Sequence, residues 1–417
     1  MAMSSTFPRP GGAVAPTSAM SLFWKSIMAC LALIAGIHLW EKMFEVRNLR
    51  PKEKLRYEWI RCSKNDTRRH VLTRDSRVFV TGGAGFIGSS LMAALASRDP
   101  ARRPSTIVGL DNFNPYYSPL YKRARAQRLR QEFGLPVVEG DVCNASLLEA
   151  LFQRHQFTHV VHLAAQAGVR YSLTHPLSYV RNNLECFVTL VELIRKIPEK
   201  RRPSFVYASS SSVYGLNRKI PFSETDAVTS PANLYGASKF MNEQIAAAFH
   251  HIYGLQSVGL RFFTVYGPWG RPDMAAFLFT RAIETGKPLT LFNQGKMRRD
   301  FTYIDDIVDG VARSMEHCAY AATVFNLGNN HPVELMHFIE TIERELGAKA
   351  QMVHKVSTAE IKETYADVRK AKAQLGYKPH TSVEDGLRSF IAWYKHEPRR
   401  HTFATGGDFN NRRRALL

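Results

Sequence analysis

The stretch from Arg77 to Leu91, RVFVTGGAGFIGSSL, constrains the fold more than any other part of this chain. The apolar run Val78 to Val80 predicts a strand, and apolar residues return at helical spacing after the glycines. Gly82, Gly85 and Gly88 lie in the turn between them. Glycines there let a pyrophosphate approach the backbone, and the free N–H groups of the helix start face the phosphates. A tight turn without a ligand is the alternative, since many turns use glycine.

Strand and helix patterns alternate from Asp75 onward, which predicts an α/β fold with a Rossmann-type doubly wound parallel sheet. Ligands of such sheets bind beyond the carboxyl ends of the strands. After Phe263, prolines, glycines and aromatic residues dominate, which predicts a smaller substrate-binding lobe. The expected strands are Val78–Thr81, Thr106–Asp111, Pro136–Asp141, His159–Ala164, Ser204–Ser209 and Ser257–Phe263, and the main expected helices are Leu177–Ile197 and Ala237–Tyr253.

The N-terminal part of the chain differs in composition from the rest. Residues 22–40, LFWKSIMACLALIAGIHLW, would span roughly 28 Å as a helix, enough for a single anchor in a thin bilayer. Trp24 and Trp40 lie at its ends, where interfacial aromatic residues belong. An amphipathic surface helix is the alternative. A cleaved signal peptide is less favoured, because no A-x-A-like cleavage site follows the apolar stretch. The expected order is a disordered tail (1–21), the anchor (22–40), a stem (41–74), the nucleotide-binding domain (75–263), the lobe with segments that return to the core (264–396) and a basic tail (397–417).

Charge and cysteine content exclude some classes of protein. The formal net charge is +20, but +12 of it lies in residues 1–74 and 395–417. Without a stripe of alternating aromatic and basic residues, the pattern does not favour nucleic-acid binding. The five cysteines are scattered, odd in number and lack a C-x-x-C pair, which argues against a disulfide framework and a structural zinc site. We therefore expect neither a nucleic-acid partner nor a metal.

Polar and small residues follow three of the expected strands. Asp111 ends the second strand, where a carboxylate meets adenosine ribose hydroxyls and repels a 2′-phosphate, so NAD is favoured over NADP. It could instead be a turn aspartate beside Asn112. Asp141 ends the third strand and could accept from an adenine amine, or cap a helix. The small residues after Leu163 leave room for a cofactor, or simply end a buried strand.

Tyr235 and Lys239, in YGASK, carry the strongest chemical signal. Their i, i+4 spacing places both on one face of a helix. A free tyrosine has a pKa of about 10 and is a poor base at neutral pH. A neighbouring ammonium and the positive nicotinamide of NAD⁺ would stabilise the phenolate. A serine of the run Ser209–Ser212 could hydrogen-bond the reacting hydroxyl, although spacing does not rank the four. An ordinary helix surface and a polar loop are the alternatives.

These motifs resemble those of the extended short-chain dehydrogenase/reductase family, and most of all its UDP-glucuronate 4-epimerases. The resemblance covers residues 77–394 and implies tightly held, recycled NAD, with Tyr235 as base, Lys239 on the nicotinamide ribose and Ser210 as hydroxyl partner. It also implies a homodimer formed through helices such as Leu177–Ile197. The matching segments are TGGAGFIGSSL, LDNFNPYY, LAAQAGVRYS, ASSSSVYG, LYGASK, RFFTVYGPWGRPDM and RDFTYIDD.

The resemblance also assigns positions around the two ligands. Thr264 in RFFTVYG is similar to the form specific for uronates, and Ser211 and Ser212 would hold the sugar carboxylate. Arg271 and Arg299 would face the nucleotide and its diphosphate, and Arg170 would lie near the carboxylate. The residues expected to line NAD are Gly82, Gly85, Phe86, Ile87, Gly88, Asp111, Asn112, Asp141, Val142, Leu163, Ala164, Ala165, Tyr235 and Lys239.

The resemblance implies reversible conversion of UDP-glucuronate to UDP-galacturonate through a 4-keto sugar. A UDP-glucuronate decarboxylase, another UDP-sugar 4-epimerase and a non-catalytic NAD-binding membrane sensor are the alternatives; a sensor would not need Tyr235, Lys239 and the serines. The anchor resembles that of plant-type members, which implies a Golgi membrane protein with a luminal catalytic domain. The basic residues that follow the anchor predict the opposite orientation.

Overall fold

The computed structural model describes residues 71–292, 295–317, 321–355, 363–398 and 400–402. The expected N-terminal tail, the anchor and nearly all of the stem lie outside these residues, as does most of the basic C-terminal tail. Within the described ranges, no helix combines the length and the apolar character needed to cross a membrane.

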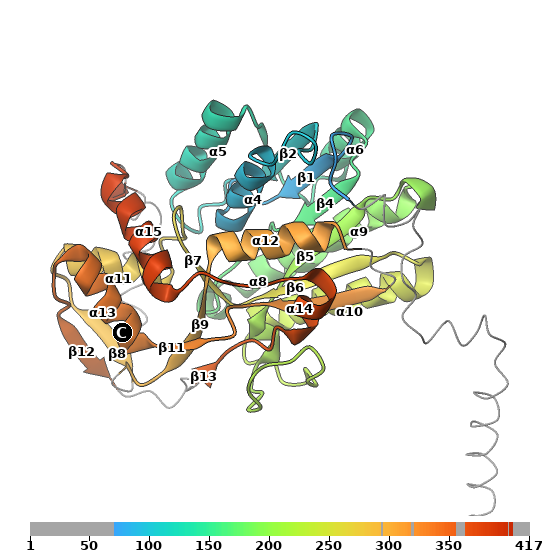
Figure 1. Ribbon diagram of the computed structural model, residues 1–417. Helices are drawn as coiled ribbons and strands as arrows, with labels where there is room; N and C mark the ends of the chain where they lie inside the picture. The colour runs from blue at the N-terminus through green and yellow to red at the C-terminus, as the bar shows by residue number, and fades with distance from the viewer. Residues whose placement is uncertain (1–70, 293–294, 318–320, 356–362, 399, 403–417) are drawn as a thin grey trace, which may run out of the picture. The chain divides into compact units, whose positions relative to one another are not determined.

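Seven parallel strands form the main sheet of the described chain, in the order β10-β6-β5-β4-β1-β2-β3 (Figure 1). The strand order reverses between β1 and β4, which is where a doubly wound sheet opens a crevice for its ligand. The predicted Rossmann-type sheet is therefore confirmed. The strands are β1 (Arg77–Thr81), β2 (Thr106–Asp111), β3 (Val137–Glu139), β4 (His159–His162), β5 (Ser204–Ser210), β6 (Ser257–Phe262) and β10 (Ala322–Leu327).

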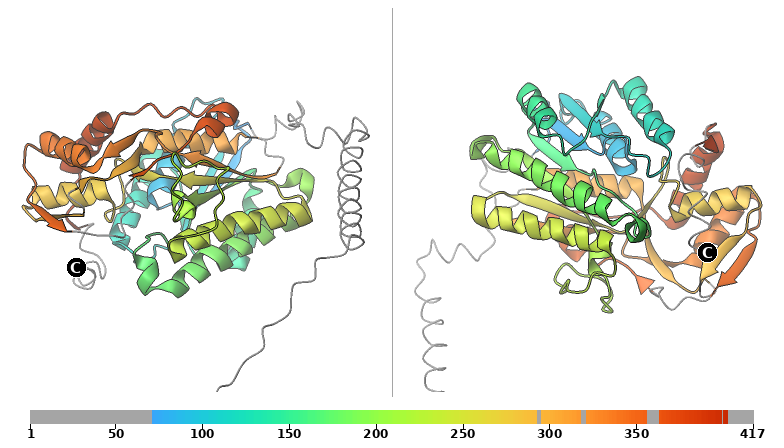
Figure 2. Two further views of the ribbon diagram at one scale, coloured as in Figure 1. Left: turned by 90° about the horizontal axis from the view of Figure 1, so that it is seen from below. Right: turned by 180° about the vertical axis from the view of Figure 1, so that it is seen from behind.

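Helices cover both faces of this sheet because successive strand residues point to opposite sides. In β1, Val78 and Val80 pack into the core beneath α4 (Phe86–Ala96), α5 (Pro119–Phe133) and α12 (Ile304–Met315). Phe79 packs into the core of the other face. Figure 2 shows the helices of that face from behind. They are α6 (Ala145–His155), α9 (Cys186–Lys196) and α10 (Leu234–Tyr253).

The expected helix over Leu177–Ile197 forms in three connected parts. They are α8 (Pro176–Tyr179), the π-helix η1 (Val180–Glu185) and α9. π-Helical turns are rare and often occur at functional sites. Here the π-turn carries Asn183, which is buried and bonded to both neighbouring segments. Its side chain accepts from Gln166 N (2.8 Å) and donates to Ser238 Oγ (2.9 Å), so it ties the loop after β4 to α10.

Apart from α12 and β10, which belong to the main sheet layer, most described segments after Phe263 build a lobe with small sheets of its own, at the left of Figure 1. Buried Asp300 organises it by accepting from the backbone N–H groups of Asn329 (2.6 Å), Asn330 (3.1 Å) and Ala366 (3.0 Å). The lobe contains β7 (Thr264–Tyr266), α11 (Ala275–Glu284), β8 (Leu289–Phe292), β9 (Arg298–Tyr303), β11 (Pro332–Glu334), α13 (Leu335–Leu346), β12 (Met352–Lys355), β13 (Glu363–Thr364) and α15 (Val383–His396).

Two expectations about the β3 region are wrong. The strand β3 ends at Glu139, so Asp141 lies in the loop that follows the strand and does not end it. The chain also contains a disulfide, between Cys143 and Cys186. These cysteines are 43 residues apart, but the loop after β3 and the start of α9 meet at one edge of the sheet. Counting cysteines and local C-x-x-C pairs does not detect such a contact, which depends on the fold.

Candidate active site

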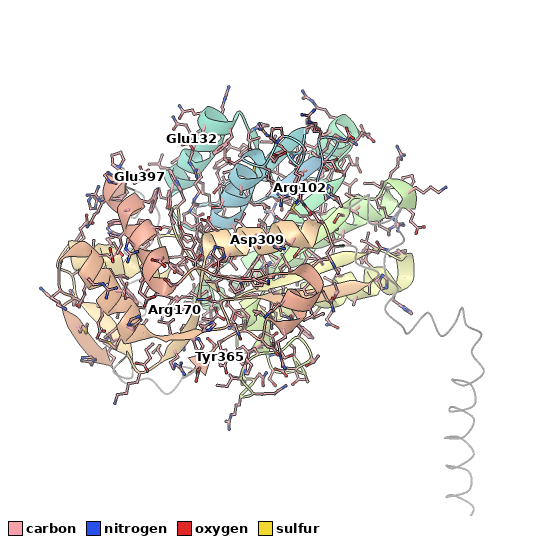
Figure 3. The ribbon with its side chains drawn as sticks, viewed as in Figure 1. Arg102, Glu132, Arg170, Asp309, Tyr365 and Glu397 are labelled. Carbon is pink, nitrogen blue, oxygen red and sulfur yellow. A yellow bond between two sulfur atoms is a disulfide. The ribbon has the colours of Figure 1, made fainter. Side chains whose placement is uncertain are left out.

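One cavity of about 1120 Å³ lies at the carboxyl ends of the main strands and extends to the lobe. Every residue predicted to contact the cofactor or the substrate lines it, including Arg170, which is labelled in Figure 3. Residues that were not predicted line it as well, among them Tyr116, Lys122, Asn182 and Asp273. The fold therefore brings the predicted set together at one place, while the role of each residue remains a prediction.

The glycine-rich turn after β1 forms a cradle whose backbone is packed too closely for larger residues. Gly82 has a φ of +71°, and a Cβ there would lie 2.8 Å from Ala164 N. A Cβ on Gly88 would lie 2.2 Å from Gly82 O, so this glycine allows α4 to pack on the turn. The helix begins at Phe86 without a side-chain cap, which leaves its first N–H groups directed to the cavity edge. The cradle fits a diphosphate of a dinucleotide.

The carboxylate of Asp111 is held at the end of β2 by the turn around it. Its Oδ2 accepts from Ala84 N (3.1 Å) and its Oδ1 from Phe113 N (2.9 Å). The second bond, from a backbone N–H two residues further on, is typical of an aspartate turn. The turn aspartate that the sequence left open as an alternative role for Asp111 is therefore present. Lys122 Nζ lies 3.9 Å from Oδ1. Asp111 lines the cavity as well, so the same backbone hydrogen bonds hold its carboxylate where it could accept from ribose hydroxyls.

Asp141 lies farther along the same edge, in the loop before α6. Its Oδ1 accepts from Cys143 N (2.8 Å), and Arg181 Nη2 lies 4.0 Å from its Oδ2. The helix-cap alternative is wrong, because Asn144 caps α6 by accepting from Leu147 N. Asp141 and Val142 line the cavity, so the carboxylate is available to a base of the bound nucleotide.

The Tyr235–Lys239 pair lies on the first turns of α10 and faces the cavity. Lys239 is buried and donates from Nζ to Ala208 O (2.8 Å). Burial lowers the pKa of Lys239 to about 8, since it disfavours the charged form. Burial raises the pKa of Tyr235, while the Ser210 hydroxyl and the charge of Arg271 lower it. The net effect of the protein is a raised pKa that favours the neutral phenol, and a bound cationic nicotinamide would act in the opposite direction, toward the phenolate.

His162, at the end of β4, is buried near Lys239 and connects to the neighbouring strand β1 through Thr81. Its Nδ1 lies 2.8 Å from Thr81 Oγ1, which in turn accepts from Ala164 N (3.2 Å). Burial, with a smaller contribution from the charge of Lys239, lowers the pKa of His162 to about 3. The imidazole is therefore neutral at physiological pH and adds no charge beside Lys239.

The structure separates the serines that sequence spacing did not rank. Ser209 lines the cavity, but its hydroxyl is engaged by a buried carboxylate, because its Oγ donates to Glu243 Oε1 at 2.5 Å. Glu243 also forms a buried ion pair with Arg261, at 2.7 Å. Ser210 accepts from Ser212 N (3.1 Å) at the start of a 3₁₀ turn and interacts with Tyr235. Ser210, Ser211 and Ser212 remain facing the cavity.

Arg271 is held by two side chains that sequence reasoning missed as site residues. Its Nε donates to Asp273 Oδ1 (3.0 Å), and its Nη2 bonds the other oxygen of the same carboxylate. Tyr116 OH donates to Asp273 Oδ2 (2.9 Å), and its ring lies 5.7 Å from the guanidinium. Asp273 is two residues beyond Arg271, so its position in the GRPDM segment was a usable signal. Tyr116 lies in the matching segment LDNFNPYY, but it is 157 residues from Asp273 and nothing in the sequence indicated their contact.

The substrate side of the cavity is built by the lobe. Thr264 begins β7, and its pairing with Phe301 of β9 places it beside the strand that carries Arg299. Arg299 donates to Arg298 O (3.0 Å) and lines the cavity. Hydroxyl groups from β5 and β7 and guanidinium groups from the lobe therefore surround one space, which suits an anionic ligand.

The fold and this site define a dinucleotide-binding enzyme with a Tyr–Lys pair beside a glycine-rich cradle. Residues 78–328 match the model of the NAD dependent epimerase/dehydratase family. This match spans more than half of the chain, and the chain belongs to this family.

Individual members of this family are similar to this chain in sequence and in structure. UDP-glucuronate 4-epimerase 4 of Arabidopsis thaliana is 45% identical over 354 residues, which cover 81% of this chain and 79% of the relative. UDP-glucuronate 4-epimerase 3 of the same plant is 48% identical over 338 residues, 77% of each chain. A crystal structure of UDP-glucuronic acid 4-epimerase from Bacillus cereus, in complex with UDP-glucuronic acid and NAD, is similar with a TM-score of 0.70 and 33% identity. The similarity covers 76% of this chain and 99% of that one.

Proposed function

We propose that this chain catalyses the NAD-dependent 4-epimerisation of UDP-glucuronate to UDP-galacturonate. The observation that carries the proposal is the placement of Tyr235, Lys239 and Ser210 on one wall of a cavity that also contains the glycine cradle and Arg271. The relatives that match over most of this chain are UDP-glucuronate 4-epimerases. Their names and the residues of the cavity point to the same reaction.

The cavity residues fit NAD, and different residues would contact different parts of the cofactor. The cradle of Gly82, Gly85 and Gly88 accommodates the diphosphate, and Asp111 excludes a 2′-phosphate by its charge. Lys239 is placed to bond the nicotinamide ribose. When bound, NAD⁺ supplies a hydride acceptor for C4 of the sugar and later a donor to the opposite face.

Tyr235 performs the proton transfers at the sugar. Its phenolate removes the proton from O4 as the C4–H bond breaks, and the phenol returns the proton when the C4–H bond forms again. Lys239 stabilises the phenolate by its charge, and Ser210 shares a hydrogen bond with O4. The 4-keto sugar must turn between the two steps. Arg271 and Arg299 hold the diphosphate during this turn, while the sugar itself is held loosely.

The carboxylate of the 4-keto sugar needs separate control. A 4-keto uronate is a β-keto acid and loses CO₂ when the bond from C5 to the carboxylate aligns with the carbonyl π system. We infer that the hydroxyl groups of Ser211, Ser212 and Thr264, three residues that line the cavity, hold the carboxylate out of this alignment. We expect Thr264→Ala to raise the fraction of UDP-pentose product; a variant that still forms only uronate at the normal rate would contradict this role.

Product analysis tests the proposed reaction. The purified protein would be incubated with UDP-glucuronate, with and without added NAD⁺, and the products identified by chromatography and mass. We expect a product of unchanged mass that co-elutes with UDP-galacturonate, and no such product from Tyr235→Phe. Loss of CO₂ by the unmodified protein would identify a decarboxylase. Bound NAD without turnover of UDP-glucuronate, UDP-glucose or UDP-xylose would favour the sensor.

We also propose that the enzyme is a Golgi membrane protein with a luminal catalytic domain. Residues 22–40 support this by their length and by the tryptophans at their ends, and the anchor resembles that of plant-type members. Protease treatment of sealed microsomes tests the orientation: a luminal domain is protected until detergent is added, and digestion without detergent would contradict it.

A homodimer is proposed from the outer helical face. Leu173 and Leu177 are 68% and 79% exposed, and Val188 on α9 and Met241 on α10 are exposed as well. Apolar side chains gathered on neighbouring helices favour a protein partner, and a second copy would present the same face. Sedimentation velocity would show a dimer that Leu177→Lys weakens. A monomeric wild-type protein at micromolar concentration would refute the dimer.

A further inference from the structure

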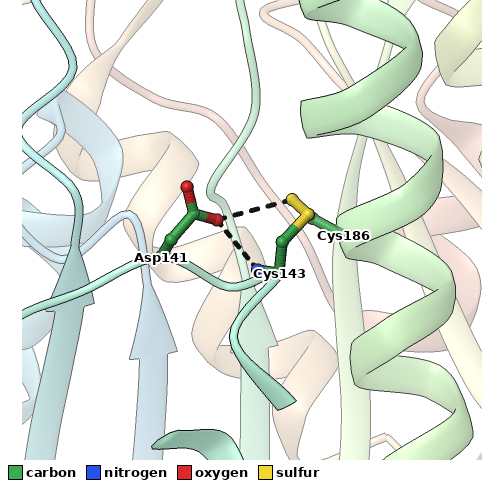
Figure 4. Close-up of side chains that lie close together, drawn as sticks. All are labelled: Asp141, Cys143 and Cys186. Carbon is green, nitrogen blue, oxygen red and sulfur yellow. Dashed lines mark hydrogen bonds between the residues drawn. A yellow bond between two sulfur atoms is a disulfide. The ribbon is translucent and has the colours of Figure 1, made fainter.

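The disulfide between Cys143 and Cys186 joins two walls of the cavity at the adenosine end (Figure 4). Cys143 lies in the loop between β3 and α6, and Cys186 is the first residue of α9. Asp141 and Val142 of that loop line the cavity, and so does Cys186 itself. The bond therefore links a loop that touches the nucleotide pocket to the helix on the other side of the pocket edge.

The two halves of the disulfide differ in their surroundings. Cys186 is 2% exposed and belongs to the hydrophobic core beneath α9. Cys143 is only partly buried and packs against the edge of this core. A soluble thiol therefore reaches Cys143 Sγ first, and any movement after the bond opens falls on the loop of Cys143 and not on α9.

Asp141 connects this sulfur pair to the nucleotide. Its Oδ1 accepts from Cys143 N (2.8 Å) and lies 3.6 Å from Cys186 Sγ. Its Oδ2 is approached by Asn112 Nδ2 (3.5 Å) and Arg181 Nη2 (4.0 Å). A disulfide sulfur carries no proton, whereas a Cys186 thiol could donate to this carboxylate. Reduction thus changes both the tether of the loop and the hydrogen bonding of its acid.

We propose that Cys143 and Cys186 form a reversible redox site that controls how firmly the adenosine end of NAD is held. In the oxidised form the tether keeps the Asp141 loop against α9 and the carboxylate directed to the pocket. In the reduced form the two sulfurs separate, the loop is released, and the Cys186 thiol competes for Asp141. This inference rests on NAD binding at the proposed site.

The exchange needs only a low-molecular-weight thiol and its disulfide, such as glutathione. A glutathione thiolate attacks Cys143 Sγ, the protein S–S bond breaks, and Cys186 leaves with the electron pair and takes up a proton. A second glutathione thiolate attacks the mixed disulfide and releases Cys143 together with glutathione disulfide. Two glutathione thiols are thereby oxidised as the protein disulfide is reduced to two thiols. The reverse sequence reforms the bond.

The local charges favour the oxidised form. The Asp141 carboxylate lies beside the leaving Cys186 sulfur and opposes the negative charge that develops on it. Arg181 partly offsets this effect from the far side of the carboxylate, and its side chain is 64% exposed. Among the described residues, Arg181 is the charged group that lies within ion-pair distance of Asp141.

NAD retention measures the proposed control directly. The full-length holoenzyme would be divided into portions held in glutathione disulfide or in reduced glutathione, and alkylation with mass analysis would establish the state of the two cysteines. The half-life of bound NAD would follow from rapid desalting at successive times. We expect it to be longer in the oxidised form by about fivefold or more, the lower end of coupling between linked sites.

Cysteine variants assign the effect to this pair. Cys143→Ser and Cys186→Ser should each show the shorter half-life in both conditions, while Cys318→Ser should keep the full response. Equal half-lives in oxidised and reduced wild-type protein would overturn the proposal, as would alkylation that shows both thiols free in glutathione disulfide. Protein that neither contains nor takes up NAD in either state would refute the proposed cofactor itself, which is a distinguishable result.

Discussion

Replacing Lys239 by Met should stabilise the protein while it removes activity. Burial lowers the pKa of Lys239 from its ordinary 10.5 to about 8, so the folded state holds this proton less tightly than the unfolded state. The difference corresponds to about 3 kcal/mol of lost folding stability at pH 7. The hydrogen bond to Ala208 O, worth about 1 kcal/mol, offsets part of the gain when Lys239 is removed. The free energy of unfolding of the variant should therefore be about 2 kcal/mol higher than that of the wild type at pH 7.

The stability difference between the wild type and Lys239→Met should depend on pH. The penalty is fully present below pH 8 and disappears as the pH rises to 10.5, because the unfolded chain then also loses its proton. The wild-type protein should thus gain about 3 kcal/mol relative to Lys239→Met over this interval, so that above its upper end the wild type is the more stable protein by about the 1 kcal/mol of the hydrogen bond. Urea unfolding of the NAD-free proteins at a series of pH values measures it. At pH 7 the rate of epimerisation should fall by about 10² to 10⁴, because the phenolate of Tyr235 loses its charged neighbour.

Lys370 supplies a matched control. It is also partly buried, donates to Val324 O (2.7 Å), and has a pKa lowered by burial, but it does not line the cavity. Lys370→Met should leave the rate within about twofold, as expected for a residue without contact to the chemistry. If Lys239→Met is less stable than the wild type at pH 7, or if their stability difference does not change between pH 8 and 10.5, the reasoning about the buried charge is wrong.

Two further predictions concern ion pairs, one of them partly exposed and the other buried. Asp273→Asn should raise the KM for the UDP-sugar by about tenfold or more with a smaller effect on kcat, since Arg271 loses a charged hydrogen-bond partner; steady-state kinetics would show a kcat loss without a KM change if this view is wrong. Glu243→Gln should lower the free energy of unfolding by about 3 kcal/mol, because it leaves the Arg261 guanidinium buried without its carboxylate. Urea denaturation measures this cost, and a loss below 1 kcal/mol would contradict it.

Local patterns in the sequence were enough to predict six of the seven strands of the main sheet and many of the residues that line the cavity. The glycines from Gly82 to Gly88 have a backbone reason to occur where they do, and Asp111 and Tyr235 follow strands or begin helices. Because all carboxyl ends of a parallel sheet meet at one edge, placing residues on elements also placed them in one cavity. The predicted β2 agrees with the structure at both ends.

Contacts between distant segments were out of reach of the same reasoning. The strand β10 was missed because Ala322–Leu327 follows the lobe and returns to pair with β6. The bond of Tyr116 to Asp273 and the Cys143–Cys186 disulfide likewise depend on how loops meet after the sheet has formed. The role of Ser209 became clear only from its contact with buried Glu243, since four adjacent serines look alike in the sequence.

The most direct test of the central claim follows the hydrogen at C4. UDP-glucuronate deuterated at C4 would be converted by the enzyme in ordinary water, and the UDP-galacturonate formed would be analysed by mass and NMR. The proposed mechanism predicts that deuterium remains at C4 of the product, since the same hydride leaves one face and returns to the other within one site. Loss of deuterium to solvent, with hydrogen at C4 of the product, would contradict the mechanism.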